Sequence, residues 1–259
     1  MLEIERKHFS FRTKEIWFSE NPFDVVGYDS ITFNDCKNRI LKPEFSCTEQ
    51  ATLVLDLTQD LELIWANMRK TFRQNIKYAQ RDGIKVRMNQ AYGEFCSLNR
   101  SFKRAKGLPA SSGWPWFSEN VEHMKKYGTL FVSELDEVLS GQFYLEDEKC
   151  IRWLVGASKR LDVGMERTML RMIGNANKLL TWEAIKYAKA KGLTEFDFGG
   201  YYTGKANDEM ENINLFKEGF GGKQITRYGY QRDYSPTYTL ARRVLRNLTS
   251  FRRKTDPNP

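Results

Sequence analysis

The chain has 259 residues, which is enough for one large domain or two small ones with separate hydrophobic cores. Hydrophobic residues make up 41% and charged residues 29%, a composition typical of soluble globular proteins that excludes a disordered tail. No run approaches the roughly 18 apolar residues of a membrane-spanning helix. The first residues mix acids with bases, unlike a signal peptide. We therefore expect a cytoplasmic protein without a transmembrane segment.

The counts of cysteine and histidine exclude several kinds of site. Cys36, Cys47, Cys96 and Cys150 include no CxxC pair, so we expect free thiols rather than a zinc site or a disulfide framework. The chain has only two histidines, and neither lies in a metal-binding or hydrolase motif. The sequence therefore predicts no metal site.

The net charge is +8, and the excess of basic residues is concentrated in two segments. Residues 69–87 contain seven basic side chains and one acidic side chain, and residues 241–259 contain six and one. Such clusters predict a phosphate-binding surface, and the alternative of a solvated helix face is equally favoured for either segment alone. The candidate tRNA-binding residues in these segments are Arg73, Lys77, Arg81, Arg242, Arg243 and Arg246.

In the first half of the chain, the periodicity of apolar residues predicts a strand at Ala51–Leu57, followed by a helix that ends at Gly83. A strand at Ile84–Met88 and a helix at Ala91–Arg104 follow. The apolar stripe of the first helix consists of Leu61, Ile64, Trp65, Met68, Phe72, Ile76 and Ala79.

The middle of the chain predicts an antiparallel meander, followed by two helices at about Gly164–Ile173 and Asn175–Lys191. A strand at Leu193–Phe198, a helix near Asn212–Glu218 and a strand at Gln224–Tyr230 come next. A final amphipathic helix would close the core with Leu240, Val244, Leu248 and Phe251, or would hold nucleic acid with its arginines. The three strands of the meander are Thr129–Leu135, Val138–Leu145 and Cys150–Val155.

This order of elements predicts an α+β fold with a mixed sheet flanked by helices. A meander followed by a helix and a strand resembles the GNAT acyltransferase fold. We expect a partial GNAT-like unit with the basic helix in residues 1–126. A second GNAT-like unit, with the basic C-terminal helix, is expected in residues 127–259.

Two nucleotide-binding motifs are incomplete. The GNAT motif R/Q-x-x-G-x-G/A would bind the CoA pyrophosphate, but Arg160 and Gly164 are four positions apart and the second small residue is absent. Gly199–Lys205 matches seven positions of a Walker A loop, but Ala206 replaces the hydroxyl residue that binds Mg²⁺. We therefore expect no bound cofactor.

Two motifs near the C-terminus carry a family resemblance. The motif Asp197-Phe-Gly-Gly200, followed by Phe216-Lys-Glu-Gly-Phe-Gly-Gly222, resembles the C-terminal half of Fem-type aminoacyl transferases, which are built from GNAT-like units. The stretch from Trp65 to Val86 is similar to their N-terminal half, and the resemblance covers about residues 50–232.

The resemblance implies a transferase that moves an amino acid from aminoacyl-tRNA, its co-substrate, to the primary amine of an acceptor. That acceptor would be a cell-wall precursor peptide or a small biosynthetic molecule. Acyl transfer from an activated ester needs positioning and a stabilised oxyanion rather than a covalent nucleophile. By the same resemblance, Lys217 lies beside the tRNA 3′ end and the reacting carbonyl, and Phe216 contacts substrate.

Several neighbouring residues allow two interpretations. Asp197 alternates with two phenylalanines and would orient or deprotonate the attacking amine, or else serve as a hydrogen-bonded structural carboxylate. Gly199 and Gly200 would admit substrate to the sheet, or form a plain tight turn. Tyr201 and Tyr202 would stack on the terminal adenine of tRNA, or pack internally.

Two further residues are candidates for contact with the acceptor. Arg152 would bind a phosphate or carboxylate of the acceptor. Trp114 would line the acceptor cleft, or fix its proline-containing loop. Two other functions stay open on this sequence: an acyl-CoA or acyl-carrier N-acyltransferase of the same fold, and a non-catalytic RNA-binding protein.

Overall fold

The computed structural model describes residues 1–109, 120–162, 164, 166–204 and 208–244. Trp114 and Arg246 therefore lie outside the described residues. The chain forms two compact units, one of residues 51–225 and one that combines residues 1–50 with the segment from 226 onward. None of the helices in the described part of the chain combines the length and apolarity that crossing a bilayer requires. All four cysteines are free thiols, and only Cys47 is exposed.

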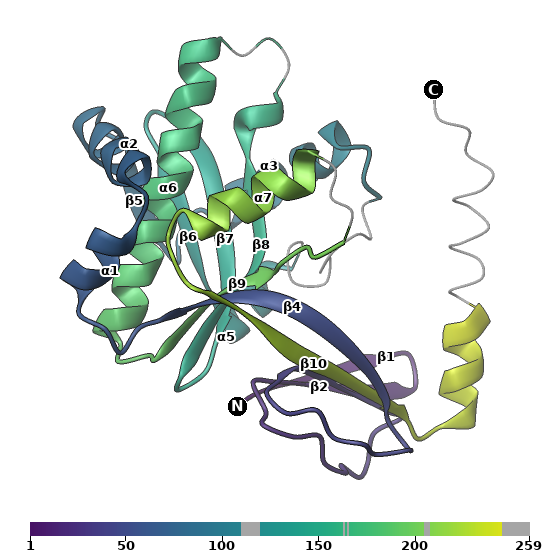
Figure 1. Cartoon of the computed structure of the whole chain (residues 1–259). Helices are drawn as coiled ribbons and strands as arrows, with labels where there is room; N and C mark the ends of the chain where they lie inside the picture. Colours follow the sequence, from purple (N-terminus) through teal and green to yellow (C-terminus); the bar gives the residue numbers. More distant parts are fainter. Residues whose placement is uncertain (110–119, 163, 165, 205–207, 245–259) are drawn as a thin grey trace. The chain divides into compact units, whose positions relative to one another are not determined.

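The larger unit contains a mixed sheet whose strands follow the order β4-β9-β8-β7-β6-β5 (Figure 1). Neighbouring strands are antiparallel except β8 and β9, which pair in parallel. The predicted meander is confirmed as β6, β7 and β8, and the α+β fold with a mixed sheet is confirmed. The strands are β4 (Ser46–Asp56), β5 (Lys85–Met88), β6 (Gly128–Glu134), β7 (Val138–Glu146), β8 (Cys150–Ser158) and β9 (Glu195–Gly200).

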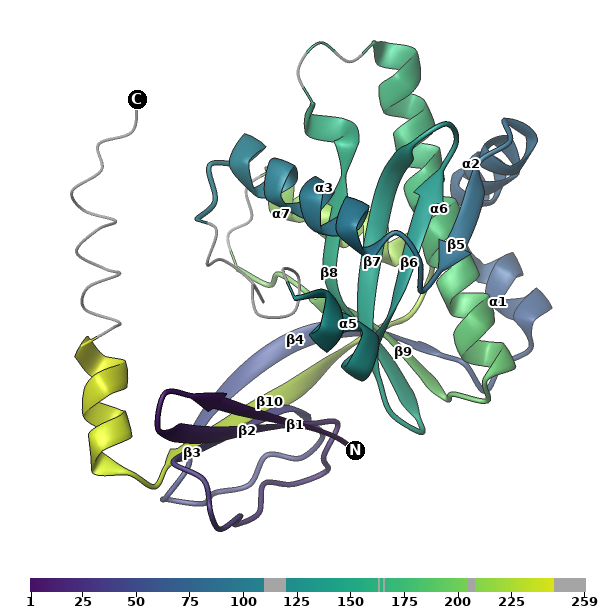
Figure 2. The ribbon, with the colours of Figure 1, turned by 180° about the vertical axis from the view of Figure 1, so that it is seen from behind.

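Helices cover both faces of this sheet. α1, α2 and α6 lie on one face (Figure 1), and α3 crosses the other face (Figure 2). The main core lies beneath the first helical layer, where Phe196, Phe198 and Tyr144 of the sheet pack with Ile76 and Leu180. The helices of this unit are α1 (Leu61–Asn67), α2 (Lys70–Arg81), α3 (Tyr92–Ala105), α5 (Val121–Tyr127), α6 (Arg167–Ala190) and α7 (Asp208–Glu218).

The helix predicted to end at Gly83 is interrupted, which corrects the sequence analysis. Met68 and Arg69 are extended, with ψ angles of 149° and 134°, and they separate α1 from α2. The backbone N–H of Arg69 donates to the carbonyl of Gly219 at 3.0 Å rather than to a carbonyl of the preceding turn. The break therefore depends on a contact far along the chain, although the buried stripe continues through Met68 and Phe72.

The two helices predicted on either side of Gly174 form the single helix α6, so that prediction is wrong. A glycine inside a helix costs only about 1 kcal/mol relative to alanine. The residues around it, Ile173, Ala176 and Leu180, are fully buried in the core. Burial of this face outweighs the weak helix propensity of glycine.

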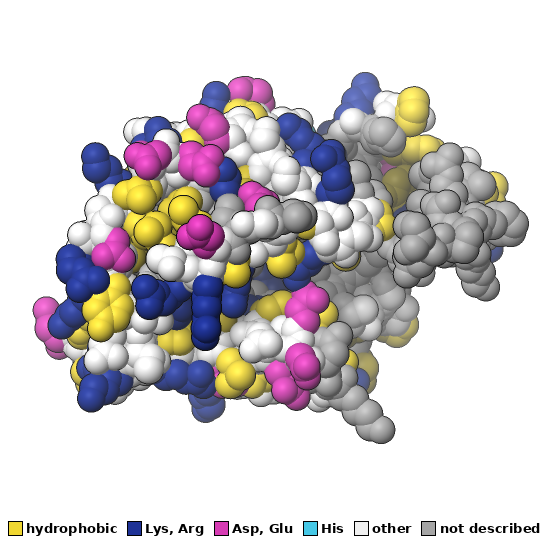
Figure 3. All heavy atoms as spheres, turned by 90° about the horizontal axis from the view of Figure 1, so that it is seen from above, with side chains coloured by type: hydrophobic (Ala, Val, Ile, Leu, Met, Phe, Trp, Pro, Cys, Tyr) yellow, Lys and Arg dark blue, Asp and Glu magenta, His cyan; other side chains and the backbone are white. Residues whose placement is uncertain are grey.

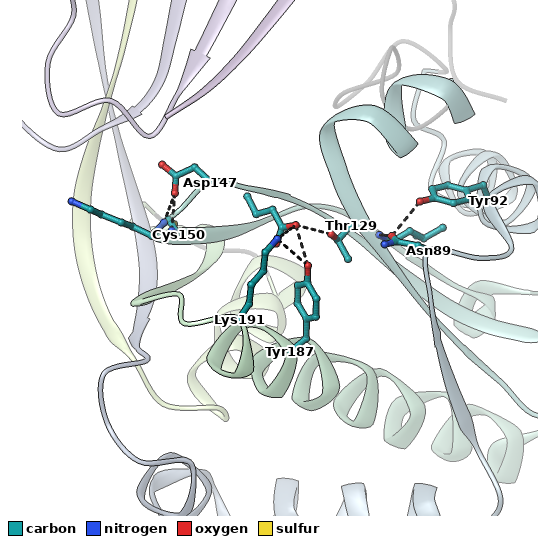
Figure 4. Close-up of polar contacts among 10 residues, drawn as sticks. Asn89, Tyr92, Thr129, Asp147, Cys150, Tyr187 and Lys191 are labelled. Atoms are coloured by element: carbon teal, nitrogen blue, oxygen red, sulfur yellow. Dashed lines mark hydrogen bonds and ion pairs between the residues drawn. The ribbon is translucent and has the colours of Figure 1, made fainter.

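A partly buried carboxylate attaches the end of α6 to the meander. Glu146 of β7 accepts hydrogen bonds at one oxygen from Thr129 at 3.0 Å, Tyr187 at 3.1 Å and Lys191 at 2.8 Å. Tyr187 and Lys191 point from the end of the helix toward the strands (Figure 4). The hydrogen bond to Glu146 raises the pKa of Lys191. This end of α6 is thus fixed against the sheet by charge as well as by packing.

The strands of the smaller unit follow the order β1-β2-β3-β10 within the sheet, and β2 and β3 are parallel. Its core contains Ile16, Ile31, Phe33, Phe45 and Tyr230. The sequence patterns predict no strand before residue 51, so β1 to β3 go beyond what the sequence indicates. The strands are β1 (Leu2–His8), β2 (Phe11–Trp17), β3 (Ser30–Cys36) and β10 (Lys223–Asp233), of which β10 begins in the larger unit.

Residues 236–244, the described part of the expected C-terminal helix, are helical. Leu240 is 62% exposed and Val244 is 49% exposed, so the prediction that these two close the core is wrong. Leu248 and Phe251 lie outside the described residues. Arg242 forms an ion pair with Asp233 at 3.1 Å, and Arg243 is exposed.

The compact units divide the chain differently from the predicted boundary at residue 126. α1, α2 and β5 precede that residue, yet they pack on or pair with the sheet that contains β6 to β9. They therefore belong to the same unit, because a sheet and the helices on its face share one core. The assignment of residues 1–126 and 127–259 to two GNAT-like units stays a prediction.

Candidate functional site

The pairing of β8 with β9 ends where the predicted site residues meet. The parallel ladder covers only three residue pairs and stops at Arg152 opposite Asp197. Just beyond it, Gly199 has a φ of +76°, and a Cβ at this position would lie 2.8 Å from the carbonyl oxygen of Trp153. Gly199 is therefore required for a close approach of protein backbone, which supports the tight-turn interpretation.

Asp197 lies at the centre of a buried hydrogen-bond network. Its carboxylate is fully buried and forms an ion pair with Arg152, which is itself buried. One carboxylate oxygen accepts the backbone N–H of Gly199 at 2.7 Å and lies beside the hydroxyl of Thr52. That hydroxyl lies 2.8 Å from the carbonyl oxygen of Gly199. These contacts match the structural-carboxylate interpretation, and a role for Asp197 as a base stays a prediction.

The alternation predicted for this strand is confirmed. Phe196 and Phe198 are buried in the main core, while Asp197 between them reaches Arg152 and Thr52. We call Thr52, Arg152, Asp197, Gly199 and Lys217 the β8–β9 junction. The ion pair satisfies two charges that would otherwise be costly to bury.

Lys217 brings a second cation to this junction. The side chain projects from the last turn of α7, the residue is 8% exposed, and its Nζ donates a hydrogen bond to the carbonyl of Gly200. Burial lowers the pKa of Lys217 to about 8, and the positive charge of Arg152 acts in the same direction, while Asp197 opposes both. The ammonium form of Lys217 therefore loses its proton near neutral pH rather than far above it.

The position of α7 is set by contacts on both of its sides. The guanidinium of Arg69 donates to the carbonyl of Leu215 at 3.2 Å and forms an ion pair with Glu218 at 3.1 Å. Glu218 also accepts the phenolic hydroxyl of Tyr201 at 2.6 Å. These contacts fix Leu215 and Glu218, the residues directly before and after the pair Phe216-Lys217. No local sequence pattern marks Arg69 or Glu218, so none of the three contacts could be predicted from the sequence.

The two tyrosines of the predicted adenine site differ in environment. The hydroxyl of Tyr201 is bound to Glu218, and this hydrogen bond raises the pKa of Tyr201. The backbone of Tyr202 exchanges hydrogen bonds with the side chain of Asn214 at 3.1 Å and 2.8 Å, and Tyr202 is 41% exposed. Of the two rings, that of Tyr202 has more surface available for a stacked base.

Phe216 belongs to an aromatic layer rather than standing alone. Its ring centroid lies 6.1 Å from that of Trp153 and 5.9 Å from that of Phe72. Phe72 also packs against Phe220 at 5.2 Å. The motif Phe216-Lys217 therefore directs an aromatic side chain into this layer and an ammonium group to the junction. A contact between Phe216 and substrate stays a prediction.

The candidate tRNA-binding residues of α2 form one stripe along the helix. Arg73, Lys77 and Arg81 are spaced by four residues, and all have at least part of their surface in solvent. Arg81 lies over the ring of Tyr78 and forms an ion pair with Asp82 at 3.3 Å. Arg242 and Arg243 lie in the smaller unit.

A surface pocket of about 340 Å³ lies elsewhere in the larger unit, between β5, β6 and α6. It contains none of the predicted site residues. It is lined by Val86, Met88, Phe131, Glu183, Lys186, Tyr187 and Ala190.

The chemistry of the junction follows from its charges. The nearly buried ammonium group of Lys217 lies next to the backbone carbonyl of Gly200, and a buried ion pair supports the strands beneath it. Such a cation stabilises an oxygen that becomes negative during a reaction, since water does not screen the interaction. The arrangement suits acyl transfer.

Comparisons with known proteins agree with this chemistry. Residues 66–209, more than half of the chain, match the family model described as an acetyltransferase (GNAT) domain. The crystal structure of FemX is similar, with a TM-score of 0.59 and 15% identity over 82% of this chain and 74% of that one. This likeness shows the fold, and the predicted GNAT-like architecture is confirmed.

Lower-scoring similarities include L-PGS from Bacillus licheniformis, with a TM-score of 0.48 and 15% identity over 82% of this chain and 70% of that one. The C-terminal domain of a putative lysylphosphatidylglycerol synthetase from Agrobacterium fabrum has a TM-score of 0.46 and 13% identity, over 79% and 68% of the two chains. No curated protein matches the chain in sequence.

We expect the Arg152–Asp197 pair to behave as a buried unit. Arg152→Met leaves an uncompensated carboxylate and should lower the free energy of unfolding by about 3–5 kcal/mol. The double variant Arg152→Met/Asp197→Asn should lose less, because it removes both charges. Urea unfolding of the wild type and these variants measures the difference. Arg81→Met, which removes the exposed partner of Asp82, is the control and should cost less than about 1 kcal/mol. A loss for Arg152→Met no greater than for this control would contradict the assignment.

Proposed function

The chain belongs to the GNAT acetyltransferase domain family, and we propose that it transfers an amino acid from aminoacyl-tRNA to the primary amine of an acceptor. The observation that carries the proposal is the contact between the two Fem-type motifs. Lys217 of the second motif donates a hydrogen bond to Gly200 of the first, at the β8–β9 junction. An acyltransferase of this fold then has a cation where the reacting carbonyl would lie.

In the proposed reaction, the acceptor amine attacks the ester carbon of the aminoacyl-tRNA. A C–N bond forms, the C–O bond to the terminal ribose breaks, and the proton lost by the amine passes to the leaving ribose oxygen. The tetrahedral intermediate carries a negative oxygen, and the ammonium group of Lys217 donates a hydrogen bond to it. No covalent enzyme intermediate is needed, because the ester is already activated.

The other residues of the junction support Lys217. The contacts of Asp197 with Arg152, Thr52 and Gly199 favour a positioning role, in which its charge also helps to keep Lys217 protonated. Tyr202 is the proposed platform for the terminal adenine, because its ring is partly exposed. Gly200 would contact the donor through the backbone that binds Lys217.

The acceptor is proposed as a cell-wall precursor peptide or a small biosynthetic molecule that carries an amine. Trp114 remains its candidate contact. The guanidinium of Arg152 is buried against Asp197, which favours a positioning role for this residue instead. Because charged tRNA is a cytoplasmic donor, we place the reaction in the cytoplasm.

Transfer of label tests the donor directly. The protein is incubated with mixed radiolabelled aminoacyl-tRNAs and candidate amines, and in parallel with labelled acetyl-CoA. Transfer from aminoacyl-tRNA that is abolished by RNase treatment would support the proposal. Transfer from acetyl-CoA that survives RNase treatment would instead favour an acyl-CoA-dependent N-acyltransferase, the second function that the family description allows. RNA binding without any transfer would favour the third function, that of a non-catalytic RNA-binding protein.

Lys217→Ala should lower kcat by about 10²–10³-fold, the scale for loss of one oxyanion donor. Binding of tRNA should persist, because the phosphate-binding side chains remain. Lys217→Arg should restore little activity, since a planar guanidinium does not replace a compact ammonium group. Lys223→Ala removes an exposed lysine of β10 and is the matched control. Full turnover of Lys217→Ala with only a raised KM would show that the lysine does not act in the chemical step.

The stripe on α2 should contribute to tRNA binding by pairing with phosphates. The variant Arg73→Ala/Lys77→Ala/Arg81→Ala should flatten the log–log dependence of affinity on salt by about one unit for each phosphate that it no longer binds. A charge-matched control replaces Lys85, Lys149 and Lys223, which are exposed outside this helix. Fluorescence anisotropy with labelled tRNA at a series of salt concentrations gives both slopes. Equal slopes for the two triple variants would assign the α2 stripe to solvent.

A further inference from the structure

The outer edge of the sheet in the larger unit is a feature that the proposed transfer does not use. Among the described strands, β5 is the last in the sheet order, and β6 is the strand that pairs with it. Figure 2 shows β5 at this edge, and β6 and β7 separate it from β8 in the strand order. No described strand therefore pairs with the outer side of β5.

The pairing with β6 shows which backbone groups of β5 point outward. The N–H of Asn89 donates to the carbonyl of Leu130 at 2.8 Å, which continues the register of the two strands. Since hydrogen-bonded and non-hydrogen-bonded pairs alternate along an antiparallel ladder, Arg87 bonds to β6, and Val86 and Met88 do not. The N–H and C=O groups of Val86 and Met88 therefore point toward the free edge.

Asn89 fixes the end of this strand. Its side-chain oxygen accepts the backbone N–H of Leu130 at 3.0 Å and the hydroxyl of Tyr92 at 3.1 Å (Figure 4). The backbone of Asn89 has a φ of +55°, and the extended strand ends at Met88. The free edge is therefore short and already ordered, which lowers the entropy cost of pairing with another strand.

The pocket of about 340 Å³ lies beside these outward backbone groups. It is lined by Val86 and Met88, together with Phe131, which lies opposite Met88 on β6. Tyr187 and Ala190 of α6 line its other side. Residues directly opposite each other on paired strands share a face of the sheet. An apolar side chain of a strand added at this edge would therefore lie at the pocket.

The opposite face of β5 carries positive charge. Lys85 and Arg87 alternate with Val86 and Met88, and Lys85 is exposed. Arg87 pairs with Glu134 of β6, whereas Lys85 forms no ion pair with any described residue. The net charge of the chain is +8, and Lys and Arg side chains are prominent on the face seen from above (Figure 3). An added strand is therefore favoured when it carries acidic residues opposite Lys85 and Arg87.

A second copy of this chain fits the edge poorly. Antiparallel pairing that joins Val86 to Met88 of the other copy would place the two Arg87 side chains directly opposite each other. Like charges at directly opposite positions destabilise a sheet. Charged side chains on edge strands commonly prevent pairing between copies in this way. The same charges attract an acidic segment.

We propose that β5 binds an extended segment of a partner protein in which acidic and apolar residues alternate. The segment would pair as an added strand, with hydrogen bonds to the N–H and C=O groups of Val86 and Met88. An apolar side chain would enter the pocket, and acidic side chains would face Lys85 and Arg87. Main-chain pairing supplies affinity in this mode of recognition, and the pocket supplies specificity. The inference does not depend on the donor or the acceptor of the proposed transfer.

Selection from a phage-displayed library of random short peptides tests the inference. The library is first depleted on the double variant Val86→Pro/Ala190→Phe and then selected on the full-length wild type. Proline at position 86 removes an outward N–H and leaves the hydrogen bonds to β6 intact. Ala190 is exposed, so a phenylalanine there fills the pocket without entering the core.

The affinity of each selected peptide is then measured by fluorescence anisotropy. Val86→Pro and Ala190→Phe should each weaken binding about tenfold or more, because the first removes a hydrogen bond and the second blocks the pocket. Lys85→Glu should weaken binding about fivefold, with a larger effect at low salt. Val86→Thr, Ala190→Ser and Lys149→Glu, which reverses an exposed charge between β7 and β8, are the matched controls and should bind as the wild type does.

A change in the peptide tests strand pairing without changing the protein. N-methylation at one set of alternate residues should abolish binding, and N-methylation at the other set should not, because only one set of N–H groups faces β5. Thermal unfolding of every variant checks the fold. The methylated peptides keep the test valid if Val86→Pro is unstable.

The outcomes separate this partner from other occupants. Enriched peptides that alternate acidic and apolar residues and respond to the variants would support the inference. No enrichment after depletion, or enriched peptides without acidic residues, would overturn it. Binding that is lost in Ala190→Phe but unchanged by Val86→Pro and by N-methylation would contradict strand pairing. Dimerisation of the wild type that Val86→Pro abolishes, measured by analytical ultracentrifugation, would assign the edge to a second copy instead.

Discussion

The buried ion pair between Arg152 and Asp197 is the interaction on which the candidate site depends. It lies at the last paired position of β8 and β9, where the one parallel pairing among the described strands of the larger unit stops. The carboxylate also binds the backbone of Gly199 and the hydroxyl of Thr52 on β4, so three strands share one buried charge. A single hydrophobic residue at either position would leave the other charge unpaired. The network therefore fixes the backbone that binds Lys217.

A second set of contacts carries Lys217 to this backbone. Arg69 binds a carbonyl and the carboxylate of Glu218 at the end of α7, and Tyr201 binds the same carboxylate from the residue after β9. The ammonium group is thus held between a helix and a strand rather than on a flexible side chain in water. Its low pKa follows from burial. The negative charge of Asp197 opposes this lowering of the pKa, and the positive charge of Arg152 adds to it. A preorganised, poorly solvated cation of this kind is what stabilisation of an oxyanion requires.

Local patterns were enough to predict much of the larger unit. Apolar residues at alternate positions predicted the meander and β9, and apolar residues three to four positions apart predicted α3 and α7. Alternation along β9 also placed Asp197 on the face opposite its neighbouring phenylalanines. The missed features depend on contacts between distant residues. The break before α2 needs the carbonyl of Gly219. β2 and β3 carry the buried charges Glu15 and Asp35, which interrupt their apolar alternation. Glu218 looks like a surface residue in the sequence, because its partners Arg69 and Tyr201 are distant along the chain.

The pKa of Lys217 tests the central claim most directly. NMR of protein with ¹³C-labelled lysine side chains follows each lysine through a pH titration, and the Lys217→Met variant identifies the resonance of Lys217. We predict a midpoint near the value of about 8 set by burial, with the ammonium form present below it. Asp197→Asn should lower the midpoint further, because it removes the negative charge that favours the ammonium form. A midpoint near 10.5, the ordinary value for lysine, that does not respond to Asp197→Asn would show that Lys217 is an ordinary solvated lysine, and would contradict the account.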